Sequence, residues 1–260
     1  MSALPDDAAT GMAAVSSEPL LEVRRLTKQF GSLRALDGVD LDVAAGSLTA
    51  LIGPNGAGKS TAFGCIAGAM KPSAGSVRFR GEEIAGMAYH RVAVLGIGRT
   101  YQIVQTFADM TVLEATTVGA LLRKPRLADA IEHARETLAF VGLAEKANRL
   151  GRVLTIADKK RLEVARALAT EPSLLLLDEV MAGLTPAECR DAVGLLRRIL
   201  ARGITVLMVE HVMEVLMPIA DYVVVIAAGR TIFRGNAHDA VRDPHVIEAY
   251  LGSPIAEEVS

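Results

Sequence analysis

The stretch GPNGAGKST, from Gly53 to Thr61, has the residue types and spacing of a loop that binds phosphate. Its glycines let backbone N–H groups wrap around a phosphate, and the start of the following helix adds a favourable dipole. Lys59 would neutralise the β- and γ-phosphate oxygens, and the Ser60 hydroxyl would bind Mg²⁺. A plain glycine-rich turn is the alternative. The stretch predicts nucleotide contacts from Gly53, Asn55, Gly56, Gly58, Lys59, Ser60 and Thr61.

The segment SLLLLDEV, at positions 173–180, has the pattern of a buried strand that ends in two acids, Asp178 and Glu179. In a protein with a phosphate loop, the first carboxylate reaches the metal ion and the second polarises the attacking water. Many buried strands end in an acid, so the pair alone is ordinary. Together with the phosphate loop it predicts hydrolysis of a nucleoside triphosphate.

Two further polar residues follow predicted strands. His211 comes after ITVLMVE, which places it at the carboxyl edge of the sheet, where open α/β sheets bind ligands. Gln102 follows the short stretch GIGRTY. From the residues alone, a structural histidine and a solvated loop amide remain alternatives to functional roles.

The spacing of apolar residues predicts several strands before Gly53, in 19–30, LRALDGVDLDV and SLTALIG. A helix is expected from Gly58 to Met70, and a hairpin with Gly81 at its turn. The region from Met110 to Leu150 is mostly helical in pattern, with Gly142 as a stop signal. A helix over 158–169 and alternating strands and helices after it predict an α/β fold with a parallel sheet covered on both faces.

The composition excludes some classes of protein. A net charge of −2 and the absence of Trp give no general attraction to nucleic acid, and we expect no such partner. Cys65 and Cys189 lack the spacing of a disulfide framework or a zinc site. No apolar run reaches the roughly 18 residues that span a bilayer. Residues 1–19 lack the features of a signal peptide and predict a disordered tail before a domain at 20–252, with a second tail at 253–260.

The order of the features resembles that of ABC transporter ATP-binding subunits over nearly the whole chain, from Leu20 to Gly252. The phosphate loop is followed by Gln102, RLEVARAL, LLLLDE, AGLTP and EH. More narrowly, GIGRTYQ, VEHVMEVLMPIADYVVVIAAG and VIEAYLG look like subunits of branched-chain amino acid importers and their urea or amide relatives. The resemblance implies a P-loop NTPase core with a mainly parallel sheet, an antiparallel β subdomain and a helical subdomain at about 103–170.

The resemblance also implies roles for single residues, with ATP and Mg²⁺ as cofactors. Phe30 matches the aromatic residue that stacks on adenine, although a core residue on a strand face is the alternative. Gln102 matches the glutamine that senses Mg²⁺ and the attacking water and abuts the membrane partner. Glu179 matches the general base, and His211 matches the histidine that contacts the γ-phosphate. The loop at 182–185 would cross to a second subunit, but its usual serine and aspartate are absent.

The segment LTIAD, at positions 154–158, stands where the family has LSGGQ. Thr155 keeps a hydroxyl that can donate to a γ-phosphate oxygen, whereas Ile156 and Ala157 replace glycines. Asp158 replaces a neutral amide. At a separation of 7 Å and an effective dielectric near 20, its repulsion of a phosphate charge would be about 2 kcal/mol. Lys159 and Lys160 could screen that charge, or Asp158 could cap the following helix.

The family architecture implies a head-to-tail pair in which LTIAD faces the ATP of the partner. We therefore expect an ATP-hydrolysing subunit that energises an importer of branched-chain amino acids or related small polar solutes. Its partners would be transmembrane permease subunits, a second ATP-binding subunit, identical or different, and indirectly a periplasmic or extracellular solute-binding protein. The subunit would lie on the cytoplasmic face of the inner membrane. Weak hydrolysis in an asymmetric pair and a soluble ABC ATPase without a transport role are the alternatives.

Overall fold

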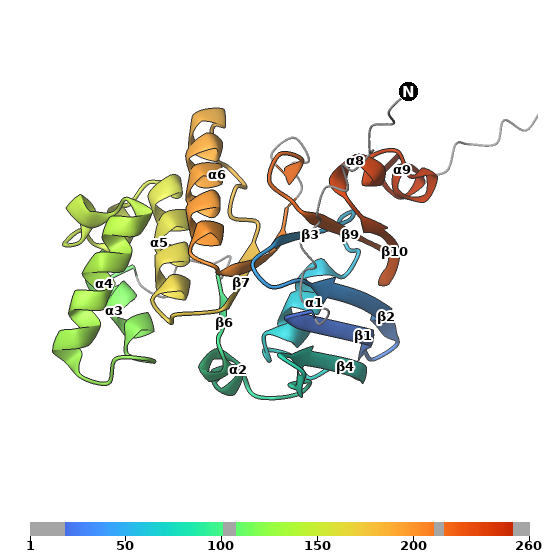
Figure 1. Cartoon of the computed structure of the whole chain (residues 1–260), viewed down its shortest axis with the longest axis horizontal. Coiled ribbons are helices and arrows are strands. Elements are labelled where there is room, and N and C mark those ends of the chain that lie inside the picture. The colour runs from blue at the N-terminus through green and yellow to red at the C-terminus, as the bar shows by residue number, and fades with distance from the viewer. Residues whose placement is uncertain (1–18, 101–107, 211–215, 252–260) are drawn as a thin grey trace, which may run out of the picture.

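The computed structural model describes residues 19–100, 108–210 and 216–251 (Figure 1). Within these ranges, no helix is both long and apolar enough to cross a lipid bilayer. The tails expected at 1–19 and 253–260 lie almost wholly outside the described residues, so those boundaries stay predictions.

An antiparallel sheet of four strands, in the order β2-β1-β4-β5, carries the first strands of the chain. Its strands are β1 (Leu21–Phe30), β2 (Leu33–Val43), β4 (Ala74–Phe79) and β5 (Glu82–Glu83). Gly81 forms the turn between β4 and β5 with a φ of 77°, a conformation that favours glycine. The predicted hairpin is therefore confirmed.

A sheet of six strands, in the order β10-β9-β3-β8-β7-β6, forms the centre of the fold. Neighbouring strands are parallel except for the hairpin of β9 and β10. The strands are β3 (Leu48–Ile52), β6 (Ile97–Arg99), β7 (Leu174–Asp178), β8 (Thr205–Val209), β9 (Tyr222–Ala227) and β10 (Arg230–Gly235).

Helices cover this sheet and extend beyond its β6 edge. They are α1 (Lys59–Ile66), α2 (Tyr89–Leu95), α3 (Val112–Ala120), α4 (Leu127–Val141), α5 (Ile156–Leu168), α6 (Pro186–Ala201), α8 (Ala237–Ala240) and α9 (Pro244–Leu251). Two 3₁₀ turns, η2 (Ala144–Lys146) and η3 (Gly151–Val153), precede α5. Figure 1 shows α3, α4 and α5 together at the end of the molecule opposite the antiparallel sheet, where the helical subdomain is expected.

The strands β3, β7 and β8 of the central sheet are buried on both faces, as their uninterrupted apolar residues predict, whereas the edge strand β10 is partly exposed. Along β7, Leu175 and Leu177 belong to one apolar cluster, which α5 and α6 complete. The intervening Leu174 and Leu176 belong to a second cluster, which α1 and the antiparallel sheet complete. Because successive side chains of a strand point to opposite faces, β7 contributes leucines to the apolar clusters on both faces of the sheet.

Two helix boundaries differ from those expected. The helix predicted to run to Met70 ends at Ile66, because Gly68 adopts a φ of 75° and the N–H groups of Ala69 and Met70 both bond to the Gly64 carbonyl. The helix expected from residue 158 begins at Ile156. The stop at Gly142 is confirmed, since this residue ends α4 in the left-handed conformation.

Candidate functional site

The loop between β3 and α1 is held tightly against its neighbours, and two of its glycines have no room for a side chain. Gly53 has a φ of 151°, and a Cβ atom there would overlap the carbonyl oxygen of Ile226 in β9. Gly58 has a φ of 103°, and its Cβ would lie 2.5 Å from the Ala35 carbonyl oxygen. Asn55 and Gly56, at the tip of the loop, are exposed. The loop thus presents backbone to solvent, as phosphate binding requires.

Lys59 begins α1 and is buried, with only 6% of its surface exposed. Its ammonium donates hydrogen bonds to the carbonyl oxygens of Gly53 (2.7 Å) and Pro54 (2.9 Å). Burial lowers the pKa of Lys59 below its ordinary value, while the negative charges of Glu179 and Asp178 oppose that shift. The predicted phosphate-binding lysine and both predicted acids therefore lie within electrostatic reach of one another. Ser60 and Thr61 follow in the first turn of α1, where Ser60 is exposed.

Asp178 ends β7 and is 5% exposed. Its Oδ2 atom accepts a hydrogen bond from Arg99 Nη2 at 3.2 Å, and its backbone N–H donates to the Thr100 hydroxyl at 3.1 Å. Burial raises the pKa of Asp178 above its ordinary value, and the Arg99 guanidinium offsets part of that shift. The Oδ1 atom is buried and has no hydrogen-bond partner in the described part of the chain. A buried, uncommitted carboxylate oxygen fits the role of a ligand to Mg²⁺.

Glu179 follows in an unusual conformation, with a φ of 49°. Its N–H donates to the Val209 carbonyl at 3.0 Å, and its own carbonyl accepts from Lys160 Nζ at 2.7 Å. A left-handed residue other than glycine costs on the order of 1 kcal/mol and persists where its surroundings fix it. Hydrogen bonds with residues of both β8 and α5 therefore hold the backbone of Glu179, the predicted general base.

Sequence reasoning missed three residues that shape this edge of the sheet. Arg99 and Thr100 come from the end of β6 and both contact Asp178. Glu210 follows β8, is 1% exposed, and accepts a hydrogen bond from the Met181 N–H at 2.8 Å. The rule that ligands gather at the carboxyl ends of parallel strands could have identified all three, because each follows or ends such a strand.

Phe30, the predicted adenine-stacking residue, lies at the end of β1 with 45% of its surface exposed. The Lys28 ammonium is 4.9 Å from the centroid of its ring. The alternative of a buried core residue is therefore wrong, and stacking on adenine stays a prediction. Gln102 and His211 lie outside the described residues, so their predicted roles also stay predictions.

The LTIAD segment forms the start of α5. Thr155 is the N-cap, and its hydroxyl accepts from the Asp158 N–H at 3.2 Å. Asp158 is 4% exposed and pairs with the Lys146 ammonium at 2.5 Å. Burial would raise the pKa of Asp158, but hydrogen bonds from Lys146 and Thr155 outweigh burial and hold it below its ordinary value. Thr155 and not Asp158 is therefore the cap of α5, and Asp158 lies in the first turn of the helix. Its carboxylate pairs with Lys146, whereas Lys159 and Lys160 were the expected partners.

Replacing Asp158 with Gln is expected to lower the free energy of unfolding by about 1–3 kcal/mol at pH 7, because the buried carboxylate and its interactions with Lys146 and Thr155 are lost. Since folding lowers this pKa, the stabilisation is fully present above the ordinary value of 3.8 and is lost as the pH falls through the folded value. The difference between wild type and variant in urea denaturation should therefore shrink in acid.

The matched control for this change is Asp191→Asn. Asp191 pairs with Arg161 at 3.1 Å, but 66% of its side chain is exposed, so the loss should stay below about 1 kcal/mol. An Asp158→Gln variant as stable as the wild type would show that the pair with Lys146 contributes nothing.

Comparison with known proteins assigns these features to a family. The family model described as "ABC transporter" matches residues 36–182. The high-affinity branched-chain amino acid transport ATP-binding protein BraF of Pseudomonas aeruginosa is 39% identical over 252 residues, with 91% of this chain and 99% of the relative covered. The corresponding protein LivG of Escherichia coli is 36% identical with the same coverage.

Solved structures agree with the sequence relatives. The crystal structure of a nucleotide-free ATP-binding cassette from an ABC transporter matches with a TM-score of 0.84 at 31% identity, covering 90% of this chain and 99% of that chain. The expected α/β architecture, with its mainly parallel sheet, antiparallel sheet and helical region, is thereby confirmed. Because the family model spans both the phosphate loop and Asp178, over residues 36–182, the chain belongs to the ABC transporter family as an ATPase subunit.

Proposed function

We propose that this subunit hydrolyses ATP to energise the import of branched-chain amino acids or related small polar solutes. The observation that carries the proposal is that the chain combines a phosphate loop, whose buried Lys59 bonds to the Gly53 carbonyl, with the buried Asp178 at the end of β7, whose Oδ1 atom is uncommitted. The class of solute follows the printed names of BraF and LivG, which are branched-chain amino acid transport proteins.

Different residues of the chain bind the phosphates and activate the attacking water. Backbone N–H groups of the phosphate loop and Lys59 bind the phosphates and lower their negative charge. Glu179 takes a proton from a water molecule as the water oxygen bonds to the γ-phosphorus. The bond from that phosphorus to the bridging oxygen breaks, and its electron pair leaves with ADP.

Ser60, Asp178 and Gln102 are the residues that would hold Mg²⁺, which neutralises phosphate charge as a Lewis acid when bound. The uncommitted Oδ1 atom of Asp178 supports this assignment. Phe30 would stack on the adenine ring, which its exposure allows. His211 would contact the γ-phosphate.

A head-to-tail pair of subunits would complete each site, with Thr155 of one subunit facing the ATP of the other. Thr155 and Ile156 are exposed, so the start of α5 is open to such a contact. Because Lys146 neutralises Asp158, we expect little of the phosphate repulsion that the substitution for glutamine suggests. This pairing favours an active subunit over one with weak hydrolysis.

A surface groove of about 280 Å³ offers a place for the permease subunits. Residues of α2, β6, α3 and α5 line it, including Arg99, which precedes the Gln102 loop by three positions. The apolar side chains of Val118 in α3 and of Leu122, just after α3, are 47% and 37% exposed there. We propose that a permease segment binds in this groove and holds the subunit at the cytoplasmic face of the membrane.

Replacing Val118 with Asp should abolish association with the permease, because it places a charge among apolar contacts. The test is co-purification with the transmembrane proteins encoded beside this gene, followed by ATP-driven uptake of leucine, isoleucine and valine into proteoliposomes. ATP hydrolysis by the isolated subunit should change less than about twofold, since surface substitutions away from a site are mild.

The matched control for Val118 is Leu127→Asp, which changes an exposed leucine, 61% exposed, at the start of α4. Leu127 is not among the residues that line the groove. Equal co-purification of both variants would reject the groove as the permease site. Uptake of none of the three amino acids by an intact complex would reject branched-chain amino acids as the solute.

A further inference from the structure

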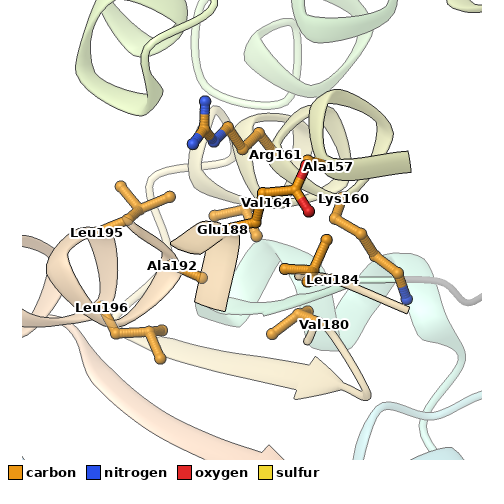
Figure 2. A pocket seen from close by; sticks show the side chains of 10 residues that line it. All are labelled: Ala157, Lys160, Arg161, Val164, Val180, Leu184, Glu188, Ala192, Leu195 and Leu196. Atoms are coloured by element: carbon orange, nitrogen blue, oxygen red, sulfur yellow. The ribbon is translucent and has the colours of Figure 1, made fainter. Parts of the chain in front are cut away.

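Lys160 connects α5 to the backbone of Glu179. Its ammonium lies 2.7 Å from the Glu179 carbonyl oxygen, within hydrogen-bond distance. Figure 2 shows the Lys160 side chain extending from α5 past Leu184 and Val180, with its ammonium directed away from the small apolar pocket that they line. A hydrogen bond from a charged donor is roughly twice as strong as a neutral one.

Hydrogen bonds to the N–H and the carbonyl of Glu179 fix the peptide groups on either side of its Cα atom. The N–H bond to Val209 holds the preceding peptide, and the carbonyl bond from Lys160 holds the following one. Both dihedral angles of Glu179 are set in this way, at a φ of 49° that this residue type rarely adopts. The same carbonyl also accepts a longer hydrogen bond, at 3.3 Å, from the Ala182 N–H of its own loop. Without Lys160, no hydrogen bond would connect this carbonyl to α5.

The helix that carries Lys160 is itself well anchored. Ala157 and Val164 of α5 pack toward Val180 and Leu184 around the same small pocket (Figure 2). Lys160 therefore connects the loop after β7 to a helix that packing holds in place. Its positive charge also lowers the pKa of Asp178, against the larger effect of burial.

We infer that Lys160 is a positioning residue for hydrolysis. By binding the backbone carbonyl of Glu179, it orients the side-chain carboxylate of the same residue. This inference rests on the proposed role of Glu179 as the general base. In this scheme Lys160 contacts neither the nucleotide nor the attacking water. It affects the rate of the chemical step through the orientation of Glu179. Its loss should lower kcat and leave the binding of ATP unchanged.

The test compares wild type, Lys160→Met, Lys160→Arg and the control Arg161→Gln, which removes a charge from the next position of α5. Lys160→Met should lower kcat by about 10–100-fold, the range for a misplaced catalytic group. KM and the affinity for a fluorescent ATP analogue should change less than about twofold, because that change removes no binding contact. Lys160→Arg should recover most of kcat, and Arg161→Gln should retain it.

A double variant separates positioning from a general structural effect. If Lys160 acts only through Glu179, then Lys160→Met combined with Glu179→Gln should hydrolyse ATP no more slowly than Glu179→Gln alone. Multiplied losses, or an unchanged kcat in Lys160→Met, would overturn the inference. Thermal denaturation identifies a variant that has lost its fold, and Lys160→Gln then replaces Lys160→Met.

The same experiment distinguishes failure of the inference from failure of the proposed function. If wild type does not hydrolyse ATP, or Glu179→Gln is as fast as wild type, the proposed function or its base is wrong. If Glu179→Gln is slow and Lys160→Met is fast, only the role of Lys160 is wrong.

Discussion

Glu179→Gln is expected to slow ATP hydrolysis about 10²–10⁴-fold, the contribution of a well-placed general base. Glutamine has nearly the same shape but cannot accept the proton of the attacking water. The hydrogen bonds that hold this loop use the backbone of Glu179, through Val209 and Lys160, so the substitution leaves them in place. The measurement is steady-state release of phosphate at saturating ATP.

ATP binding should survive the same substitution, and the variant should still dimerise with ATP on size-exclusion chromatography. Glu188→Gln is the control, because this nearby carboxylate caps α6 through Thr185 and has no part in the proposed chemistry. Its hydrolysis should stay within about twofold of wild type, as for most substitutions away from a site. Unchanged turnover in Glu179→Gln would remove Glu179 from the role of base.

The strands and the phosphate loop could be predicted from sequence because their signals are local. The short apolar run LLLLD, which follows Pro172, favours a buried strand, and it forms β7 with Asp178 at its exit. The glycine spacing of the phosphate loop is also a local signal, and at Gly53 and Gly58 a side chain does not fit. Each of these inferences needs only a short window of residues and the rules of backbone geometry.

The partners of the charged residues could not be predicted, because they depend on how distant segments pack. Arg99 and Asp178 are 79 positions apart and meet only because β6 and β7 are neighbours in the sheet. Lys159 and Lys160 adjoin Asp158 in sequence, but Lys146, from the 3₁₀ turn before α5, pairs with it. Along a helix, adjacent residues point in different directions, so proximity in sequence is a poor guide to pairing.

In the LTIAD segment, the pairing of one charged residue changes what the sequence implies about the phosphate site. Comparison with LSGGQ at the level of residue types predicts an added negative charge beside a phosphate. In the folded chain, that charge is 4% exposed and paired, so it serves the stability of α5. What the segment presents to solvent is the Thr155 and Ile156 pair. The substitution is therefore better described as a buried ion pair in the first turn of α5 than as damage to a phosphate site.

Gly53→Ala is expected to weaken ATP binding at least about 100-fold and to lower the free energy of unfolding by about 2–4 kcal/mol, in the range of severe steric substitutions. The added Cβ would overlap the Ile226 carbonyl oxygen. Ile226 is fully buried in β9 and paired with Thr231 of β10, so it cannot move aside without breaking the sheet. The phosphate loop must move in its place. Isothermal titration with ATP and urea denaturation measure the two effects.

Gly203→Ala is the matched control, since Gly203 has a φ of 78° and open space around its missing side chain. It should lose only the conformational strain of about 1 kcal/mol and keep full ATP affinity. A second control, Gly56→Ala, tests the loop itself, because a Cβ there meets nothing within 4 Å. If contact with β9 sets the loop conformation, Gly53→Ala must be far more damaging than Gly56→Ala. Equal losses in the two variants would mean that crowding at Ile226 does not determine how this loop binds phosphate.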